Sequence, residues 1–305
     1  MKINSCSVIS LTLIAIFSAC VSQPDETSEN PAVSKIIFLD SSNDADVTNI
    51  FIMNTDGSER TQITHFPEAD GDVAWPSWSP DGRKILYAMY KGETANLYII
   101  NSDGSGRITV PDEADFQDTP CWSGDGTEVA YTTVAPDGER NIIKVVKVDG
   151  SGQYFVEDKE RGLGYQTWSP VEALFALEFS TGGPPDIYTM SALDGSNRTR
   201  LTNDPKLDEW PAFSRDGKQI AWAHGVEGDK DIWVMNVDGS DKRKVTNNVA
   251  IGDSYPSFSP DGSQIAFMSG GEGGPTSIYI VNLDGTGLTK IATGANPAWS
   301  PFSNN

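Results

Sequence analysis

Carboxylates placed shortly before predicted strands are the residues of this chain best suited to do chemistry. Asp72, Asp118, Asp208 and Asp253 each precede such a strand by a few residues. Gathered at one end of those strands, they would focus negative potential. Their oxygens would suit Ca²⁺ or Mg²⁺, or a Lys or Arg side chain from a partner. We treat these four residues as a possible metal site and, with Glu209, as the candidate binding site. The alternative is that they cap loop amides or face water.

Other chemistry has little support in the sequence. The chain has only two histidines, His65 and His224. Cys121 is interpreted as a small buried residue on a strand, since a nucleophile would need a nearby base. We find no EF-hand loop, zinc spacing, phosphate-binding glycine loop or dinucleotide fingerprint. No catalytic residue or certain cofactor is therefore assigned, and a non-catalytic protein is favoured.

The charge of the chain narrows the class of partner. The formal net charge is -21 at pH 7. Nucleic acids are excluded as expected ligands, because their phosphates would be repelled and no basic stripe offsets the charge. A basic protein, a cationic small molecule or a hard metal ion fits better. The alternative is that the acidity only keeps the protein soluble.

A repeat of 41 to 46 residues predicts the architecture. An aromatic residue followed by Ser recurs six times, at Trp78, Trp122, Trp168, Phe213, Phe258 and Trp299. An Asp-Gly pair after an apolar run also recurs six times, at Asp56, Asp103, Asp149, Asp194, Asp238 and Asp284. A period of this length, built from short strands and glycine turns, is typical of a β-propeller.

Each repeat predicts four antiparallel strands. In the clearest copy the strands cover 74–79, 84–90, 96–101 and 107–110, with a tight turn at Pro80-Asp81-Gly82. Residues 35–39 look like a second strand without a first, and the chain ends in a first strand near Trp299. Joining the two would leave no open edge. We predict an all-β fold, a six-bladed β-propeller over residues 35–305, closed by its terminal strands and monomeric.

The antiparallel strands sort the connections onto two faces. The turn side carries the Pro-Asp-Gly and Asp-Gly turns, whose aspartates are interpreted as turn formers. The loop side carries the loops between second and third strands and those between blades. Most loop acids, including the five candidate residues, fall on the loop side, and most basic residues fall on the turn side. The repeated aromatic residues are expected to pack between blades.

The N-terminal segment differs from the repeats. Lys2 precedes a short apolar run that ends at Phe17-Ser18-Ala19-Cys20. This arrangement resembles a bacterial lipoprotein signal, with residues 1–19 removed and lipid attached to Cys20. The alternative is an ordinary secretory signal. Residues 20–34 are polar and are interpreted as a flexible tether. We expect a lipid-anchored protein of the periplasm or cell surface, with the outer membrane favoured.

The repeat resembles that of TolB-type propellers. The resemblance rests on Pro76 to Gly82, on Pro256 to Gly262, on Ile232 to Gly239 and on Leu201-Thr202. It implies docking of envelope proteins, peptidoglycan-associated ones among them, by a propeller expected to lack the N-terminal domain of TolB. The repeat is also similar to propellers of prolyl-oligopeptidase-type peptidases and oligogalacturonate lyases. The missing Gly-x-Ser-x-Gly elbow and the scarcity of histidine argue against both activities.

Three hypotheses follow. The first is a non-catalytic cell-envelope lipoprotein that binds a protein through its acidic loop side. The second is a binder of carbohydrate or small ligands, or a metal-assisted polysaccharide lyase or hydrolase, at the channel mouth. The third is a structural spacer.

Overall fold

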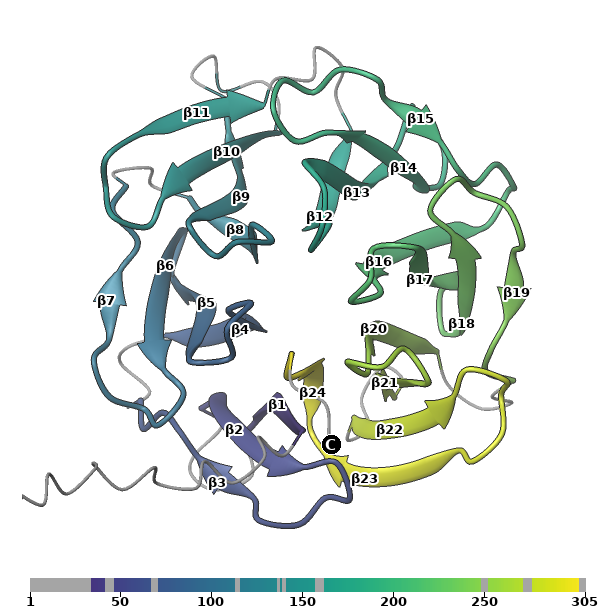
Figure 1. The fold of residues 1–305 in the computed structure, drawn as a ribbon, viewed down its shortest axis with the longest axis horizontal. Helices are drawn as coiled ribbons and strands as arrows, with labels where there is room; N and C mark the ends of the chain where they lie inside the picture. The colour runs from purple at the N-terminus through teal and green to yellow at the C-terminus, as the bar shows by residue number, and fades with distance from the viewer. Residues whose placement is uncertain are drawn as a thin grey trace, which may run out of the picture. The chain divides into compact units, whose positions relative to one another are not determined.

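Six four-stranded sheets are arranged around a central channel in a computed structural model of the chain (Figure 1). The structure describes residues 34–41, 47–66, 71–112, 116–135, 138, 141–156, 162–247, 252–270 and 276–301. The predicted signal peptide, Cys20 and residues 20–33 of the predicted tether lie outside these ranges. No helix among the described residues has the length and apolar character needed to cross a membrane.

Every blade has the same strand order, from the channel outward. The inner strands are β4 (Asp72–Trp78), β8 (Asp118–Trp122), β12 (Leu163–Trp168), β16 (Leu207–Phe213), β20 (Asp253–Phe258) and β24 (Ala295–Trp299). The second strands are β5 (Lys84–Lys91), β9 (Glu128–Val134), β13 (Leu174–Phe179), β17 (Gln219–Val226), β21 (Gln264–Ser269) and β1 (Lys35–Asp40).

The third and fourth strands complete the blades. The third strands are β6 (Thr94–Asn101), β10 (Asn141–Lys147), β14 (Asp186–Ser191), β18 (Asp229–Asn236), β22 (Ser277–Asn282) and β2 (Asn49–Asn54). The outer strands are β7 (Ile108–Thr109), β11 (Gln153–Val156), β15 (Thr199–Arg200), β19 (Arg243–Lys244), β23 (Thr289–Thr293) and β3 (Thr61–Gln62).

The core lies between the blades. One cluster joins Leu86 and Leu97 of one blade to Trp122 and Val129 of the next. The prediction that the aromatic-Ser residues pack between blades is confirmed at this position. Both faces of a second strand are covered, so the five residues 85–89 of β5 are all buried. This burial arises because each sheet lies between two neighbouring sheets of the ring.

The predicted closure of the ring is confirmed. Strand β24 pairs antiparallel with β1, and Trp299 lies opposite Ile36 (Figure 1). The Ser300 N–H donates to the Lys35 carbonyl at 2.8 Å. The Lys35 N–H donates to Ser300 Oγ at 2.9 Å. The last and first strands of the described chain thus complete one blade and leave neither as an open edge.

Candidate functional site

A bulge interrupts every inner strand where the strand meets the channel. In β4, Trp75 and Pro76 together lie opposite the single residue Tyr87 of β5. Equivalent register shifts occur in the other five inner strands. The first bulge residue has a positive φ, near +50°, in five of the six strands: Trp75, Thr119, Trp210, Tyr255 and Asn296. In each of these five the next residue is proline.

The bulges close the channel with aromatic rings. We call Trp75, Tyr165, Trp210 and Tyr255, each from a different inner strand, the central aromatic cluster. Ring centroids of Trp75 lie 5.6 Å from Tyr165 and 5.5 Å from Tyr255. Those of Trp210 and Tyr255 lie 4.5 Å apart. A left-handed conformation costs a non-glycine residue about 1–2 kcal/mol, so these packed rings must offset that cost at Trp75, Trp210 and Tyr255.

Two of the predicted site residues border the central aromatic cluster. Asp118 accepts a hydrogen bond from Tyr90, whose hydroxyl accepts one from Trp75 Nε1 at 2.8 Å. Glu209 pairs with Lys230 at 2.7 Å, and the Lys230 ammonium lies 4.7 Å from the centroid of the Trp210 ring. Burial raises the pKa of Tyr255, and so do the charges of nearby carboxylates, first Glu178 and then Glu209 and Asp118. The loop-side end of the channel is therefore acidic.

Lys230 places a positive charge among the carboxylates of this end. Its side chain is buried between Glu209 and the exposed Glu227, which lies 2.9 Å away. Burial alone would lower the pKa of Lys230, but hydrogen bonds to the two carboxylates outweigh burial and raise it. The ammonium is thus held by two carboxylates at once.

The other three predicted residues differ in environment. Asp72 is exposed at the first position of β4. Asp208 is fully buried and accepts hydrogen bonds from Trp222 Nε1 and His224 Nδ1, both at 2.7 Å. Asp253 is fully buried and accepts one from Thr246 Oγ1 at 2.6 Å. The inner strands begin earlier than predicted, so these aspartates lie within the strands rather than in the preceding loops.

The geometry bears on the metal hypothesis. Among the described residues, the three-residue group close enough to share a metal ion is Asp204, Asp208 and His224, with ligand atoms within 4.8 Å of one another. Of the predicted ligands only Asp208 belongs to it. His224 Nδ1 already bonds Asp208 and lies 3.6 Å from the exposed Asp204. A hydrogen bond between His224 and Asp208 accounts for this group without an ion.

The turn-side aspartates form local turns, as predicted. Asp103 Oδ1 accepts a hydrogen bond from the Ser105 N–H at 2.9 Å, and Asp238 Oδ1 accepts one from the Ser240 N–H at 2.9 Å. These bonds lower the pKa of both aspartates, the side-chain bonds from the same serines contributing most. Their carboxylates stabilise the turns through these hydrogen bonds, as expected of turn-forming aspartates.

Sequence reasoning missed Glu178, which joins two bulges. Its carboxylate accepts hydrogen bonds from the Trp210 N–H at 2.6 Å and the Tyr165 N–H at 3.4 Å. Burial raises the pKa of Glu178 to about 7. The available signal was the X-Pro pair in five inner strands, since proline inside a sheet is confined to edges and bulges. That signal locates the bulges but does not identify Glu178.

Glu178 should make the propeller less stable as pH rises. Its pKa in the folded protein, about 7, exceeds the ordinary value of 4.5. Between these values the folded state holds a proton that the unfolded state has lost, so stability falls as pH increases. Glu178→Gln keeps an acceptor for Trp210 and should raise the free energy of unfolding near pH 8 by on the order of 2 kcal/mol.

Urea unfolding at acidic and mildly alkaline pH measures this effect. The wild type should lose stability across the window, and Glu178→Gln should flatten that part of the profile. Glu172→Gln is the matched control, because Glu172 is exposed on the same blade. Identical pH profiles for the wild type and Glu178→Gln would rule out the assigned titration.

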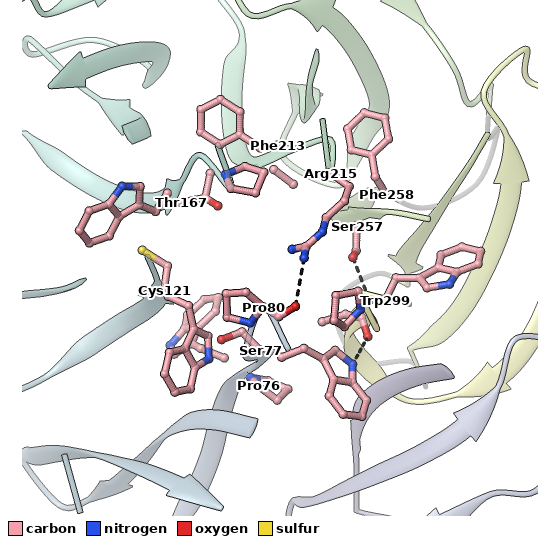
Figure 2. Close-up of a pocket in the computed structure, with 18 of the residues that line it drawn as sticks. Pro76, Ser77, Pro80, Cys121, Thr167, Phe213, Arg215, Ser257, Phe258 and Trp299 are labelled. Atoms are coloured by element: carbon pink, nitrogen blue, oxygen red, sulfur yellow. Dashed lines mark hydrogen bonds between the residues drawn. The ribbon is translucent and has the colours of Figure 1, made fainter. Parts of the chain in front are cut away.

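A cavity of about 250 Å³ extends from the central aromatic cluster to the turn-side residues Ser79, Pro80 and Gly124, and Figure 2 labels part of its lining. Residues of all six inner strands line it. Its lining includes the whole central aromatic cluster and Arg215, but no acidic residue. The lining of this cavity therefore carries a guanidinium and no carboxylate, whereas Asp118 and Glu209 border the cluster at the loop-side end.

The propeller is similar to proteins of known family and structure. Residues 208–304 match the TolB beta propeller domain. The crystal structure of TolB from Acinetobacter baumannii superposes with a TM-score of 0.75, at 21% identity, over 89% of this chain and 67% of that one. The chain is a TolB-like six-bladed β-propeller.

Two curated relatives share part of their length with this TolB-like propeller. The Tol-Pal system protein TolB of Bordetella pertussis is 28% identical over 145 residues, which are 48% of this chain and 33% of that protein. The uncharacterized peptidase YuxL of Bacillus subtilis is 26% identical over 188 residues, which are 59% of this chain and 25% of that protein. The match thus spans a quarter to a third of these relatives.

Proposed function

We propose that the chain is a non-catalytic lipoprotein of the cell envelope, anchored through Cys20 and exposed to the periplasm. Its TolB-like propeller binds an envelope protein through the loop-side end of the channel. The observation that carries this proposal is the group of carboxylates around the central aromatic cluster, in a propeller similar to a Tol-Pal system protein. A peptidoglycan-associated protein is the partner class that this similarity favours.

The chemistry of the loop side supports a partner that inserts a Lys or Arg side chain. Asp118 is partly exposed, Asp72 is exposed, and Glu227 is exposed beside Lys230. Two carboxylates already hold the buried Lys230 ammonium at this end. An incoming cation would meet the same oxygen-rich surface, and charge complementarity would mainly set specificity and the rate of association.

The structure sharpens the choice of variants. Substituting Asp208 or Asp253 would disturb buried hydrogen bonds, so a loss of binding could reflect unfolding. We define the loop-side variant as Asp72→Asn, Asp118→Asn and Glu227→Gln, because Glu227 is exposed whereas Glu209 is the less exposed partner of the buried Lys230. Asn and Gln keep acceptor oxygens for Tyr90 and Lys230.

A turn-side variant is the matched control. It combines Asp103→Asn, Asp149→Asn and Asp194→Asn, which change the net charge equally on the opposite face. Asn also supports the same local turns.

Crosslinking capture from native envelopes tests the proposed function. Wild type and the turn-side variant should capture the same envelope protein, and the loop-side variant should lose it because the cation's counter-charges are gone. All three should melt at similar temperatures. Equal capture by both variants would contradict binding through the loop side.

A further inference from the structure

The cavity on the turn side of the channel has a single charged group. Its lining contains eight prolines and six of the chain's eight tryptophans, together with small polar side chains. Arg215 is the one cation in this lining, and the lining contains no Asp or Glu. In a chain with a net charge of -21, this is an unusual local balance.

Arg215 occupies a position that proline fills in most blades. The residue after the serine of each aromatic-Ser pair stands at the cavity mouth, and the six are Pro80, Gly124, Pro170, Arg215, Pro260 and Pro301. The turn that follows is the same with either residue. Gly82 N–H donates to the Ser79 carbonyl at 2.8 Å, and Gly217 N–H donates to the Ser214 carbonyl at 2.9 Å. The turn itself therefore does not require arginine.

The guanidinium of Arg215 reaches across the mouth. Its Nη2 donates to the Pro80 carbonyl at 3.0 Å, on a different blade (Figure 2). No ion pair involves Arg215 within the described part of the chain. Arg215 is an exposed residue, and partial desolvation of its side chain lowers its pKa. A guanidinium has five N–H donors, so one bond to a carbonyl leaves most of them available for an anion.

Tryptophan and proline side chains form flat walls around the cavity, and two polar atoms of these walls have no hydrogen-bond partner among the described residues. Trp122 lines it, and its buried Nε1 has no hydrogen-bond partner among the described residues. The buried Ser77 Oγ, also in the lining, has no partner there either. Leaving such groups unsatisfied costs about 1–3 kcal/mol each. Both atoms are buried inside the walls rather than exposed to the cavity, so stacking on the flat walls and pairing with Arg215 are the contacts open to a ligand.

We propose that this cavity binds a small monocarboxylic acid with a flat ring. Arg215 would bind the carboxylate with paired N–H donors, a geometry that suits a guanidinium. The ring would stack on the tryptophan and proline walls. The volume lies just below the range of about 300–1,000 Å³ typical of ligand pockets, so a compact acid fits better than a polymer. This site lies beyond the central aromatic cluster from the proposed protein-binding end and is independent of it.

Binding of matched acids and neutral analogues tests the proposal. Benzoate and nicotinate are the acids, and benzamide and nicotinamide are their uncharged counterparts. Calorimetry gives the affinity, and the fluorescence of the cavity tryptophans reports occupancy. At least one acid should saturate the wild type at millimolar concentration and bind at least tenfold more tightly than its neutral counterpart.

Arg215→Pro is the decisive variant, because four blades already carry proline at this position. It should keep the melting temperature and lose the preference for the acid at least tenfold. Arg83→Gln removes an exposed turn-side charge outside the cavity and should bind like the wild type. The proposal is overturned if neither acid binds, if acid and neutral analogue bind equally, or if Arg215→Pro keeps the preference. None of these outcomes affects capture through the loop side.

Discussion

Asp208→Ala is expected to lower the free energy of unfolding by about 3–5 kcal/mol. The carboxylate is fully buried and accepts hydrogen bonds from Trp222 Nε1 and His224 Nδ1. Alanine would leave both donors without that acceptor and would open a small void within the blade. Each consequence is costly in an interior that water does not reach. Urea unfolding followed by circular dichroism measures the change.

Asp204→Ala is the matched control for this substitution. Asp204 is exposed and lies 3.6 Å from the same His224 nitrogen. Its removal should change stability by no more than about 0.5 kcal/mol. Asp208→Asn should recover part of the loss, since its amide oxygen can still accept a hydrogen bond. Equal stability of Asp208→Ala and wild type would show that Asp208 does not stabilise its blade through these hydrogen bonds.

Trp299→Ala is expected to cost about 3–5 kcal/mol and to loosen the ring at its seam. Trp299 is buried in a cluster with Ile36, Phe38 and Ile280. Its Nε1 donates to Ser34 Oγ, and its backbone N–H donates to Ser257 Oγ at 2.9 Å. These contacts hold β24 between β1 and the preceding blade. Alanine keeps the backbone bond to Ser257 but removes the ring packing and the Nε1 bond at the seam, where no continuous chain joins β24 to β1.

Trp122→Ala separates the effect of closure from that of packing. Trp122 occupies the same position in a blade made of continuous chain and is 7% exposed, against 8% for Trp299. Both variants should lose stability. Hydrogen exchange should accelerate first in β1 and β24 of Trp299→Ala, below the global unfolding transition. Uniform acceleration across all blades in Trp299→Ala would contradict a specific role for this residue in closure.

The repeat made the blades predictable from sequence. The strands, the Asp-Gly turns and the aromatic-Ser residues recur at the same spacing, so the strands assigned in one repeat predict those of the other five. The closure of the ring was predictable because residues 35–39 form a second strand without a first, and the strand at Trp299 is a first strand without a second. The turn aspartates were also predictable, because an aspartate followed by glycine usually accepts a hydrogen bond from a backbone N–H of the same turn.

The candidate site was less predictable because it depends on side-chain environment. Asp72 and Asp208 look alike in sequence, yet one is exposed and the other is buried against Trp222 and His224. The partners of Asp208 come from β17, the neighbouring strand, and no local pattern marks them. Each bulge adds one residue and changes which side chain meets the channel. Glu178 joins the bulges of two blades, a contact that only the assembled ring creates.

The most direct test is the affinity of a purified peptidoglycan-associated protein from the same organism, measured against salt concentration. Binding to the wild type should weaken as salt rises, because opposite charges are screened. The loop-side variant should bind at least tenfold more weakly, which corresponds to about 1.4 kcal/mol, and should show a flatter salt dependence. The turn-side variant should match the wild type. Equal affinity and equal salt dependence for all three would contradict recognition through the acidic end of the channel.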